Sequence, residues 1–111
     1  LEDASQENGC MWAIPGGHRN NLKSRFYRNK KGDGTEMEII DDSPWETSKL
    51  VPLEVRAGSM IVLHGLLPHM SHANRSERTR HAYTMHIIDG LADYPEWNWL
   101  QRPTEMPLRG F

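Results

Sequence analysis

Short apolar runs alternate with turn residues along this chain, a pattern that predicts brief β-strands joined by loops. The apolar run 10–14 lies between Glu7-Asn8-Gly9 and Pro15-Gly16-Gly17, and we expect a strand there that enters a sharp turn. Residues 36–40 predict a second short strand, and the apolar alternation over 50–55 predicts a third. The chain is therefore expected to be dominated by β-structure.

The most informative stretch, residues 58–88, predicts a strand, a turn and another strand. Residues 60–64 form an apolar run with the length of a buried strand, and Pro68 marks a sheet edge or the start of a strand. Residues 73–79 are polar and predict a turn that side-chain hydrogen bonds stabilise. Residues 80–88 then alternate as a strand does.

This arrangement brings two chemically distinctive side chains toward each other. His69 and Arg80 are expected near the facing ends of adjacent antiparallel strands, where both can point into one cavity. His81 would point to the opposite face from Arg80. An imidazole that can bind metal and a permanent cation in one pocket favour a metal site that also holds an anionic ligand.

The other histidines leave an alternative open. His64, His69 and His72 together invite a three-histidine metal site, although His72 falls in the polar turn, where we expect it to be exposed. His86 is expected to be a hydrogen-bonded core histidine, and His18 is expected to order the loop after the first strand.

The remaining segments carry weaker signals. The basic run within 19–34 is expected to be a solvated loop, with a contact to an anionic substrate such as an acyl-CoA phosphate as the alternative. Trp12 is expected in the core, and lining a pocket is its alternative role. Residues 91–111 predict an irregular aromatic tail, because Pro103 and Pro107 prevent one long helix.

Composition and charge narrow the class of protein. The 111 residues allow one small domain, and 13 basic against 15 acidic residues give a net charge of −2, which makes nucleic acid an unlikely partner. The single cysteine, Cys10, excludes an intrachain disulfide and favours a reducing, cytoplasmic setting. We find no apolar run of membrane-spanning length and no signal peptide.

Several short motifs occur together in a recognisable order. Arg80 follows His69 by eleven positions across a polar turn. The other pieces are Leu1-Glu2-Asp3-Ala4, Glu7-Asn8-Gly9-Cys10, Ile14-Pro15-Gly16-Gly17-His18, Leu66-Leu67-Pro68-His69-Met70-Ser71, Asn74, Arg80-His81-Ala82-Tyr83-Thr84-Met85-His86 and Asn98-Trp99-Leu100-Gln101. In this order they resemble the phytanoyl-CoA dioxygenase family of Fe(II)- and 2-oxoglutarate-dependent oxygenases.

The resemblance implies an all-β dominated fold in which residues 1–111 are the C-terminal part of a single domain. That domain would be a double-stranded β-helix, a jelly-roll or cupin-like barrel with long loops. His69 would be the distal metal histidine and Arg80 would bind the 2-oxoglutarate carboxylate. Ser71 is a further candidate for that carboxylate, or else caps the turn. Fe(II) and 2-oxoglutarate are the implied cofactors, ascorbate is an additional candidate, and the substrate would be a small molecule such as an acyl-CoA or another hydrophobic carboxylic derivative.

One part of the family pattern is missing from the sequence. The family's iron site needs a His-x-Asp pair, and no histidine here has a carboxylate two positions later. Since Leu1 also falls where the family has the end of a strand, we expect this chain to be the C-terminal part of a longer protein. A non-catalytic β-barrel binding module or an inactive truncated product stays open as an alternative. So does a cupin-like metal protein without 2-oxoglutarate, although Arg80 would then lack a purpose.

Overall fold

The computed structural model describes residues 1–110, which form two compact units. The first unit comprises Leu1–Asn21 with Ser43–Met85, and the second comprises Leu22–Asp42 with His86–Phe111. Regular structure in the described residues consists of short strands and two single-turn 3-10 helices, so the predicted β-rich class is confirmed. The strands form one three-stranded and one two-stranded sheet, and neither is closed into a barrel.

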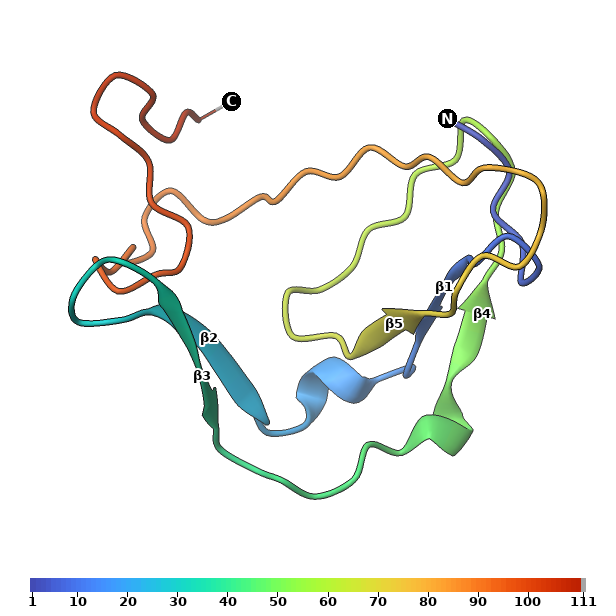
Figure 1. Cartoon of the computed structure of the whole chain (residues 1–111), viewed down its shortest axis with the longest axis horizontal. Helices are drawn as coiled ribbons and strands as arrows, with labels where there is room; N and C mark the ends of the chain where they lie inside the picture. Colours follow the sequence, from blue (N-terminus) through green and yellow to red (C-terminus); the bar gives the residue numbers. More distant parts are fainter. Residues whose placement is uncertain (111) are drawn as a thin grey trace. The chain divides into compact units, whose positions relative to one another are not determined.

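The first unit is built on an antiparallel sheet with the strand order β4-β1-β5 (Figure 1). Its central strand is β1 (Met11–Ala13), flanked by β4 (Val51–Leu53) and β5 (His69–Ser71). The strands predicted at 10–14 and 50–55 are therefore confirmed.

The small core of the first unit surrounds the central strand. Cys10, Ala13 and Ile14 are the buried apolar residues among those described. After Ile14 the chain turns through Gly16, whose φ of 75° is the left-handed conformation that glycine adopts without steric cost. The 3-10 helix η1 (Gly17–Arg19) follows the turn, and a second, η2 (Thr47–Lys49), precedes β4.

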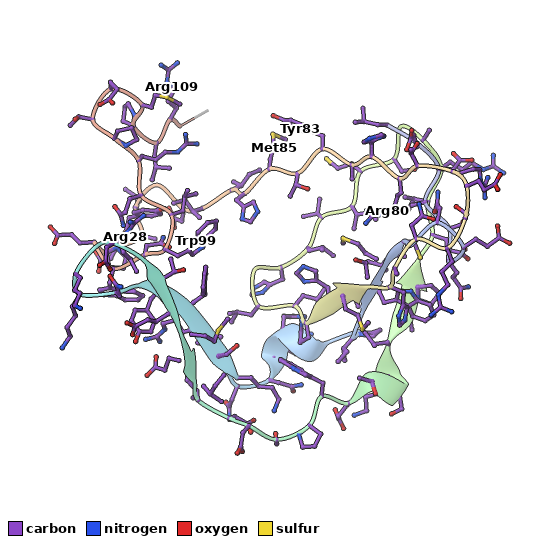
Figure 2. All side chains as sticks on the ribbon, viewed as in Figure 1. Arg28, Arg80, Tyr83, Met85, Trp99 and Arg109 are labelled. Carbon is purple, nitrogen blue, oxygen red and sulfur yellow. The ribbon has the colours of Figure 1, made fainter. Side chains whose placement is uncertain are left out.

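Two strands predicted from the sequence do not form in the described residues. Residues 60–64 have no regular secondary structure, and the side chains of Met60 and Val62 are 82% and 81% exposed. Residues 80–88 likewise form no strand, and Tyr83 and Met85 project from a trace without a strand arrow (Figure 2). An apolar pattern directs side chains, but a strand also needs a neighbouring backbone to complete its hydrogen bonds.

The second unit contains a β-hairpin and the tail of the chain. Strand β2 (Ser24–Arg28) pairs with β3 (Thr35–Ile39), which confirms the strand predicted at 36–40. The prediction of a solvated loop over 19–34 is wrong for β2, because the strand-forming pair Phe26 and Tyr27 lies hidden among basic residues.

The tail is irregular but contacts the hairpin. Asn98 forms an isolated antiparallel bridge with Tyr27, and the N–H of Arg28 donates to the carbonyl of Trp97 over 2.8 Å. The ring of Trp99 lies 6.0 Å from that of Phe26. None of the helical segments within residues 1–110 has the length and hydropathy that a membrane crossing requires.

Candidate functional site

Strand β5 carries two of the predicted site residues on one face. His69 lies opposite Ala13 of β1, and Ser71 lies opposite Met11. Directly opposed residues in an antiparallel pair share a face, and residues two apart along a strand lie about 7 Å from each other on it. His69 and Ser71 therefore point to the same side of the sheet. Ser71 belongs to the strand itself, just before the polar turn.

The imidazole of His69 is held in one orientation by its own backbone neighbourhood. Its Nδ1 lies 2.8 Å from the carbonyl oxygen of Leu67, and since a carbonyl only accepts, Nδ1–H is the donor. The neutral ring then carries its free lone pair on Nε2. The side chain is exposed, so this nitrogen is accessible to a ligand. A histidine that binds metal through one nitrogen commonly donates its other N–H in this way.

The strand that carries His69 is anchored to the central strand from its first residue. The N–H of Ile14 donates to the carbonyl of Pro68 over 3.1 Å. The N–H of Leu67 closes the preceding turn by donating to the carbonyl of His64 over 2.9 Å. Pro68 has no N–H of its own, which suits the first position of an edge strand.

Arg80 does not lie on a strand beside His69, so that prediction is wrong for the described residues. Arg80 is half-buried just after the polar turn, and its label in Figure 2 marks this place. Its charge acts on Cys10, which immediately precedes β1. His69 pairs with Ala13 at the far end of β1, whereas Ser71 pairs with Met11, the residue that follows Cys10.

The Cys10 thiol has an environment that disfavours its ionised form. Burial raises its pKa, and the negative charge of Glu54 adds to the rise. The N–H of Leu53 and the charge of Arg80 act in the opposite direction with smaller effect. This places a buried neutral thiol at the head of the central strand.

A carboxylate, rather than a ladder of strand hydrogen bonds, holds the backbone beside Arg80. Glu2 accepts hydrogen bonds from the Thr79 hydroxyl and from the His81 N–H, each over 2.7 Å. The His81 N–H bond, the Thr79 hydroxyl and the His81 ring lower the pKa of Glu2 to about 2. Glu2 is therefore ionised at neutral pH and fixes the residues on both sides of Arg80.

Asn8 ties the first turn to the same region. It is 3% exposed, and its amide nitrogen donates to the carbonyls of Asp3 over 2.9 Å and Thr79 over 3.3 Å. The sequence indicates a turn at Asn8 and no role for Glu2. The available signal was an acid and an amide in neighbouring resembling pieces near the start of the chain, although their partners lie more than seventy residues away.

The predicted turn between His69 and Arg80 is confirmed in its chemistry. Asn74 accepts from the N–H of Ser76 over 2.9 Å, and its amide donates to the carbonyl of Arg78 over 2.6 Å. The Ser76 hydroxyl lies 2.9 Å from the side-chain oxygen of Asn74 and 3.2 Å from the carbonyl oxygen of Arg78, and both oxygens are acceptors for it. The turn is thus closed by side chains, as its polar composition predicted.

The alternative of a three-histidine metal site is wrong. The His64 ring stacks at a tilt on the His18 ring, with 4.9 Å between centroids. The His72 ring meets the Trp12 ring edge-on at 5.5 Å. His72 follows His69 by three residues, so along the extended chain its side chain points to the face opposite to that of His69. No group of three metal-binding side chains occurs within residues 1–110.

Three further predictions are corrected or narrowed by these contacts. Trp12 lies on the face opposite to His69 and contacts His72, so it does not line the side that His69 faces. His86 is exposed and not a core histidine, because the strand expected around it does not form. His18 contacts the ring of His64, a partner that the sequence did not suggest.

The basic segment forms a cavity at the tip of the β2–β3 hairpin. A cavity of about 310 Å³ is lined by Tyr27, Asn29, Lys30, Lys31, Asp33 and Glu36. The phenol of Tyr27 donates to Glu36 over 3.0 Å, and the amide of Asn29 donates to Asp33 over 2.8 Å. Two cationic and two anionic side chains balance there, so the lining does not by itself favour an anion.

The described residues therefore contain one histidine with a free Nε2 and no complete metal site. The resemblance implies an Fe(II) site of two histidines and one carboxylate, and His69 is the candidate for one of these ligands. The hydroxyl of Ser71 and the guanidinium of Arg80 add groups that can bind an anion.

Comparison with known proteins gives consistent matches over nearly the whole chain. The family model described as phytanoyl-CoA dioxygenase (PhyH) matches residues 1–82. Phytanoyl-CoA dioxygenase 1 of Oryza sativa subsp. japonica is 45% identical over 104 residues, covering 92% of this chain and 36% of the relative. Phytanoyl-CoA dioxygenase of Arabidopsis thaliana is 42% identical over 113 residues, covering 96% and 37%.

An animal relative matches equally broadly. Phytanoyl-CoA dioxygenase domain-containing protein 1 of Rattus norvegicus is 38% identical over 109 residues, covering 96% of this chain and 38% of the relative. The chain thus spans somewhat more than a third of the length of the curated relatives that it matches.

Proposed function

Because this chain belongs to the phytanoyl-CoA dioxygenase family, we propose that it supplies part of an Fe(II)- and 2-oxoglutarate-dependent oxygenase site. The observation that carries the proposal is the Nδ1–H bond from His69 to the Leu67 carbonyl, which leaves Nε2 free for the metal. The two remaining ligands, a histidine and a carboxylate, lie outside residues 1–111 in this proposal. We call a polypeptide that joins those ligands to residues 1–111 the longer polypeptide.

Arg80 is proposed to bind the distal carboxylate of 2-oxoglutarate. A guanidinium presents two parallel N–H donors to a carboxylate, and its charge does not titrate in proteins. Half-burial and the fixed backbone on either side of Arg80 support this role, because a restrained cation loses less entropy when it binds. Ser71 offers a hydroxyl on the same face of β5 as His69, from which it can donate to the same cosubstrate.

Fe(II), when bound, would supply the oxidative chemistry on 2-oxoglutarate and O2, with ascorbate as a candidate supporting reductant. The residues of this chain bind and orient. His69 donates a lone pair from a fixed ring, Arg80 neutralises a carboxylate, and the Glu2 carboxylate maintains the backbone that presents Arg80. We propose a jelly-roll barrel as the fold in which the longer polypeptide completes this arrangement.

The proposed substrate class rests on the names of the relatives. We propose a small hydrophobic carboxylic derivative, with an acyl-CoA as the leading case because the relatives carry that name. A reduced Cys10 is compatible with a cytoplasmic setting, which we retain as part of the proposal.

The test compares three variants of the longer polypeptide. We expect His69→Ala to abolish succinate formation and to weaken Fe(II) binding, whereas His72→Ala, which alters a ring contact on the other face, leaves Fe(II) affinity unchanged. Arg80→Lys should raise the KM for 2-oxoglutarate roughly ten- to a hundredfold, since a point charge replaces a two-pronged donor. Fe(II) titration and steady-state succinate assays measure these effects.

Other results would favour other functions. Unchanged Fe(II) affinity in His69→Ala would remove this histidine from the metal site and favour a non-catalytic binding module. Metal binding with no effect of Arg80→Lys on 2-oxoglutarate would favour a cupin-like metal protein that does not use the cosubstrate.

A further inference from the structure

Gly17, in the turn after β1, packs closely against Pro68, the residue that precedes His69. Gly17 is buried, and a methyl group placed on it would lie 2.8 Å from Cδ and 3.2 Å from Cγ of Pro68. The next atom is Cβ of Ile14 at 3.3 Å. The first of these separations is shorter than any that non-bonded carbon atoms normally keep, so Pro68 would have to move to admit a side chain.

Glycine is required at this position for space and not for backbone freedom. Gly16 adopts a φ of 75°, but Gly17 is not among the positive-φ residues of the chain and begins the 3-10 helix η1. An alanine at Gly17 would therefore be tolerated by the backbone itself. Its cost would come from the contact with Pro68.

Pro68 transmits that contact to the candidate metal ligand. Its carbonyl accepts from the N–H of Ile14 over 3.1 Å, which fixes the peptide between Pro68 and His69. The carbonyl on its other side belongs to Leu67 and accepts the Nδ1–H of His69 over 2.8 Å. A displacement of the Pro68 ring therefore disturbs both the backbone that carries the imidazole and the acceptor that orients it.

We propose that Gly17 is a positioning residue for His69: by leaving room for the Pro68 ring, it sets the orientation of the imidazole that binds metal. This inference rests on the proposed function, since it requires His69 to be a ligand. Partners that orient a metal-binding histidine typically contribute ten- to a hundredfold to metal affinity.

The test is a double-mutant cycle in the longer polypeptide. Gly17→Ala should weaken Fe(II) binding by about tenfold or more. Adding Pro68→Ala removes Cγ and Cδ of the ring, so the double variant should recover most of that loss relative to Pro68→Ala alone. Gly65→Ala is the matched control, because Gly65 lies in the turn that leads into β5, has no positive φ, and a methyl group there meets nothing within 4 Å.

The measurement is Fe(II) titration of the folded protein, with urea unfolding in parallel. A purely structural role of Gly17 would lower the unfolding midpoint and leave the Fe(II) affinity of the folded protein unchanged, which would overturn the inference. A loss that Pro68→Ala does not relieve would overturn it too. If Gly17→Ala does not fold, recovery of folding and Fe(II) binding in the double variant supports the contact, and failure of the double variant overturns it.

The proposed function is separated by its own control. If His69→Ala binds Fe(II) as tightly as the unmodified protein, the proposed function fails and this inference fails with it. If His69→Ala loses Fe(II) binding while Gly17→Ala keeps it, the inference alone is overturned.

Discussion

Strand β1 and the segment 80–88 both have sequence patterns that predict a strand, and their structures are very different. The first is an apolar run between turn residues, and the second alternates along its length. Strand β1 is paired on each side, by β4 and by β5, and Ala13 within it is 4% exposed. Residues 80–88 form no strand, and Tyr83 and Ile87 are 78% and 70% exposed.

The difference shows that a strand-like pattern of side chains does not by itself decide whether a strand forms. The backbone of β1 finds hydrogen-bonding partners within the described residues, whereas the N–H of His81 finds the carboxylate of Glu2. Backbone N–H and C=O groups bond to whatever acceptors and donors are within reach. Segment 80–88 is thus a strand-like sequence without a neighbouring strand in residues 1–110.

The exposed apolar side chains have an energetic consequence. Buried apolar residues are few, and large apolar side chains such as Leu91 and Val62 are 96% and 81% exposed. Little hydrophobic stabilisation is therefore available to oppose the loss of conformational entropy.

The largest expected effect comes from expressing residues 1–111 without the rest of the longer polypeptide. We expect residues 1–111 expressed alone to be poorly folded or to associate, because exposed apolar segments and unpaired sheet edges promote association. They should form no succinate from 2-oxoglutarate, since one histidine does not hold Fe(II) tightly. Light scattering, Fe(II) titration and succinate assays, run beside the longer polypeptide, check this.

Hydrogen exchange in the same two samples would sharpen the comparison. Amides of residues 80–88 should be unprotected in residues 1–111 alone and protected in the longer polypeptide, if the barrel that we propose pairs them. A monomeric short chain with protected 80–88 amides and 2-oxoglutarate turnover would show that our assignment of the missing ligands is wrong.

A proline substitution in each region tests the same comparison on a smaller scale. Ala13→Pro removes an N–H from a strand paired on both sides and should destabilise the longer polypeptide by about 1–3 kcal/mol. Ala82→Pro is the matched change in segment 80–88 and should cost a similar amount there, because the barrel that we propose pairs this segment. Urea unfolding measures both. A negligible loss for Ala82→Pro would mean that residues 80–88 stay unpaired in the longer polypeptide as well.

The smallest expected effect is a pH dependence confined to the start of segment 80–88. The pKa of Glu2 is lowered from 4.5 to about 2, so its contribution is complete above about pH 4.5 and is lost as the pH falls toward 2. The amide proton shift of His81, followed by NMR, should move over this window with a midpoint near 2.

The control for this titration is Glu2→Gln, which cannot ionise and should show no transition in that window. Amides of Met11–Ala13 should be unaffected, because their partners are backbone carbonyls that do not titrate. A midpoint near 4.5 would show that the Glu2 carboxylate does not hold His81 in solution.

The sequence predicted the strands in which apolar residues stand between clear turn signals. The run 10–14 and the alternation over 50–55 yielded β1 and β4, because both carry apolar residues between turn signals. Strand β2 was missed because Arg25 and Arg28 flank its aromatic pair and mask the alternation. Strands over 60–64 and 80–88 were predicted in error, since pairing is a property of the neighbours and not of the segment.

The candidate site shows the same division. The sequence proposes His69 and Arg80 as site residues through their resemblance to the family motif, and both assignments stay predictions. It did not identify the Leu67 carbonyl as the acceptor that orients His69, since every residue has a carbonyl and nothing in the side chains marks this one. The support of Thr79 by Glu2 and Asn8 depends on contacts across the whole first unit and was equally invisible.

The buried Cys10 thiol before β1 also provides a chemical probe of local opening in the first unit. Cys10 is 0% exposed and its pKa is raised, so alkylating reagents, which attack the thiolate, meet neither an accessible nor an ionised sulfur. Labelling therefore requires an opening that exposes Cys10. Because the 111 residues contain no second cysteine, the rate of modification reports openings around this one residue.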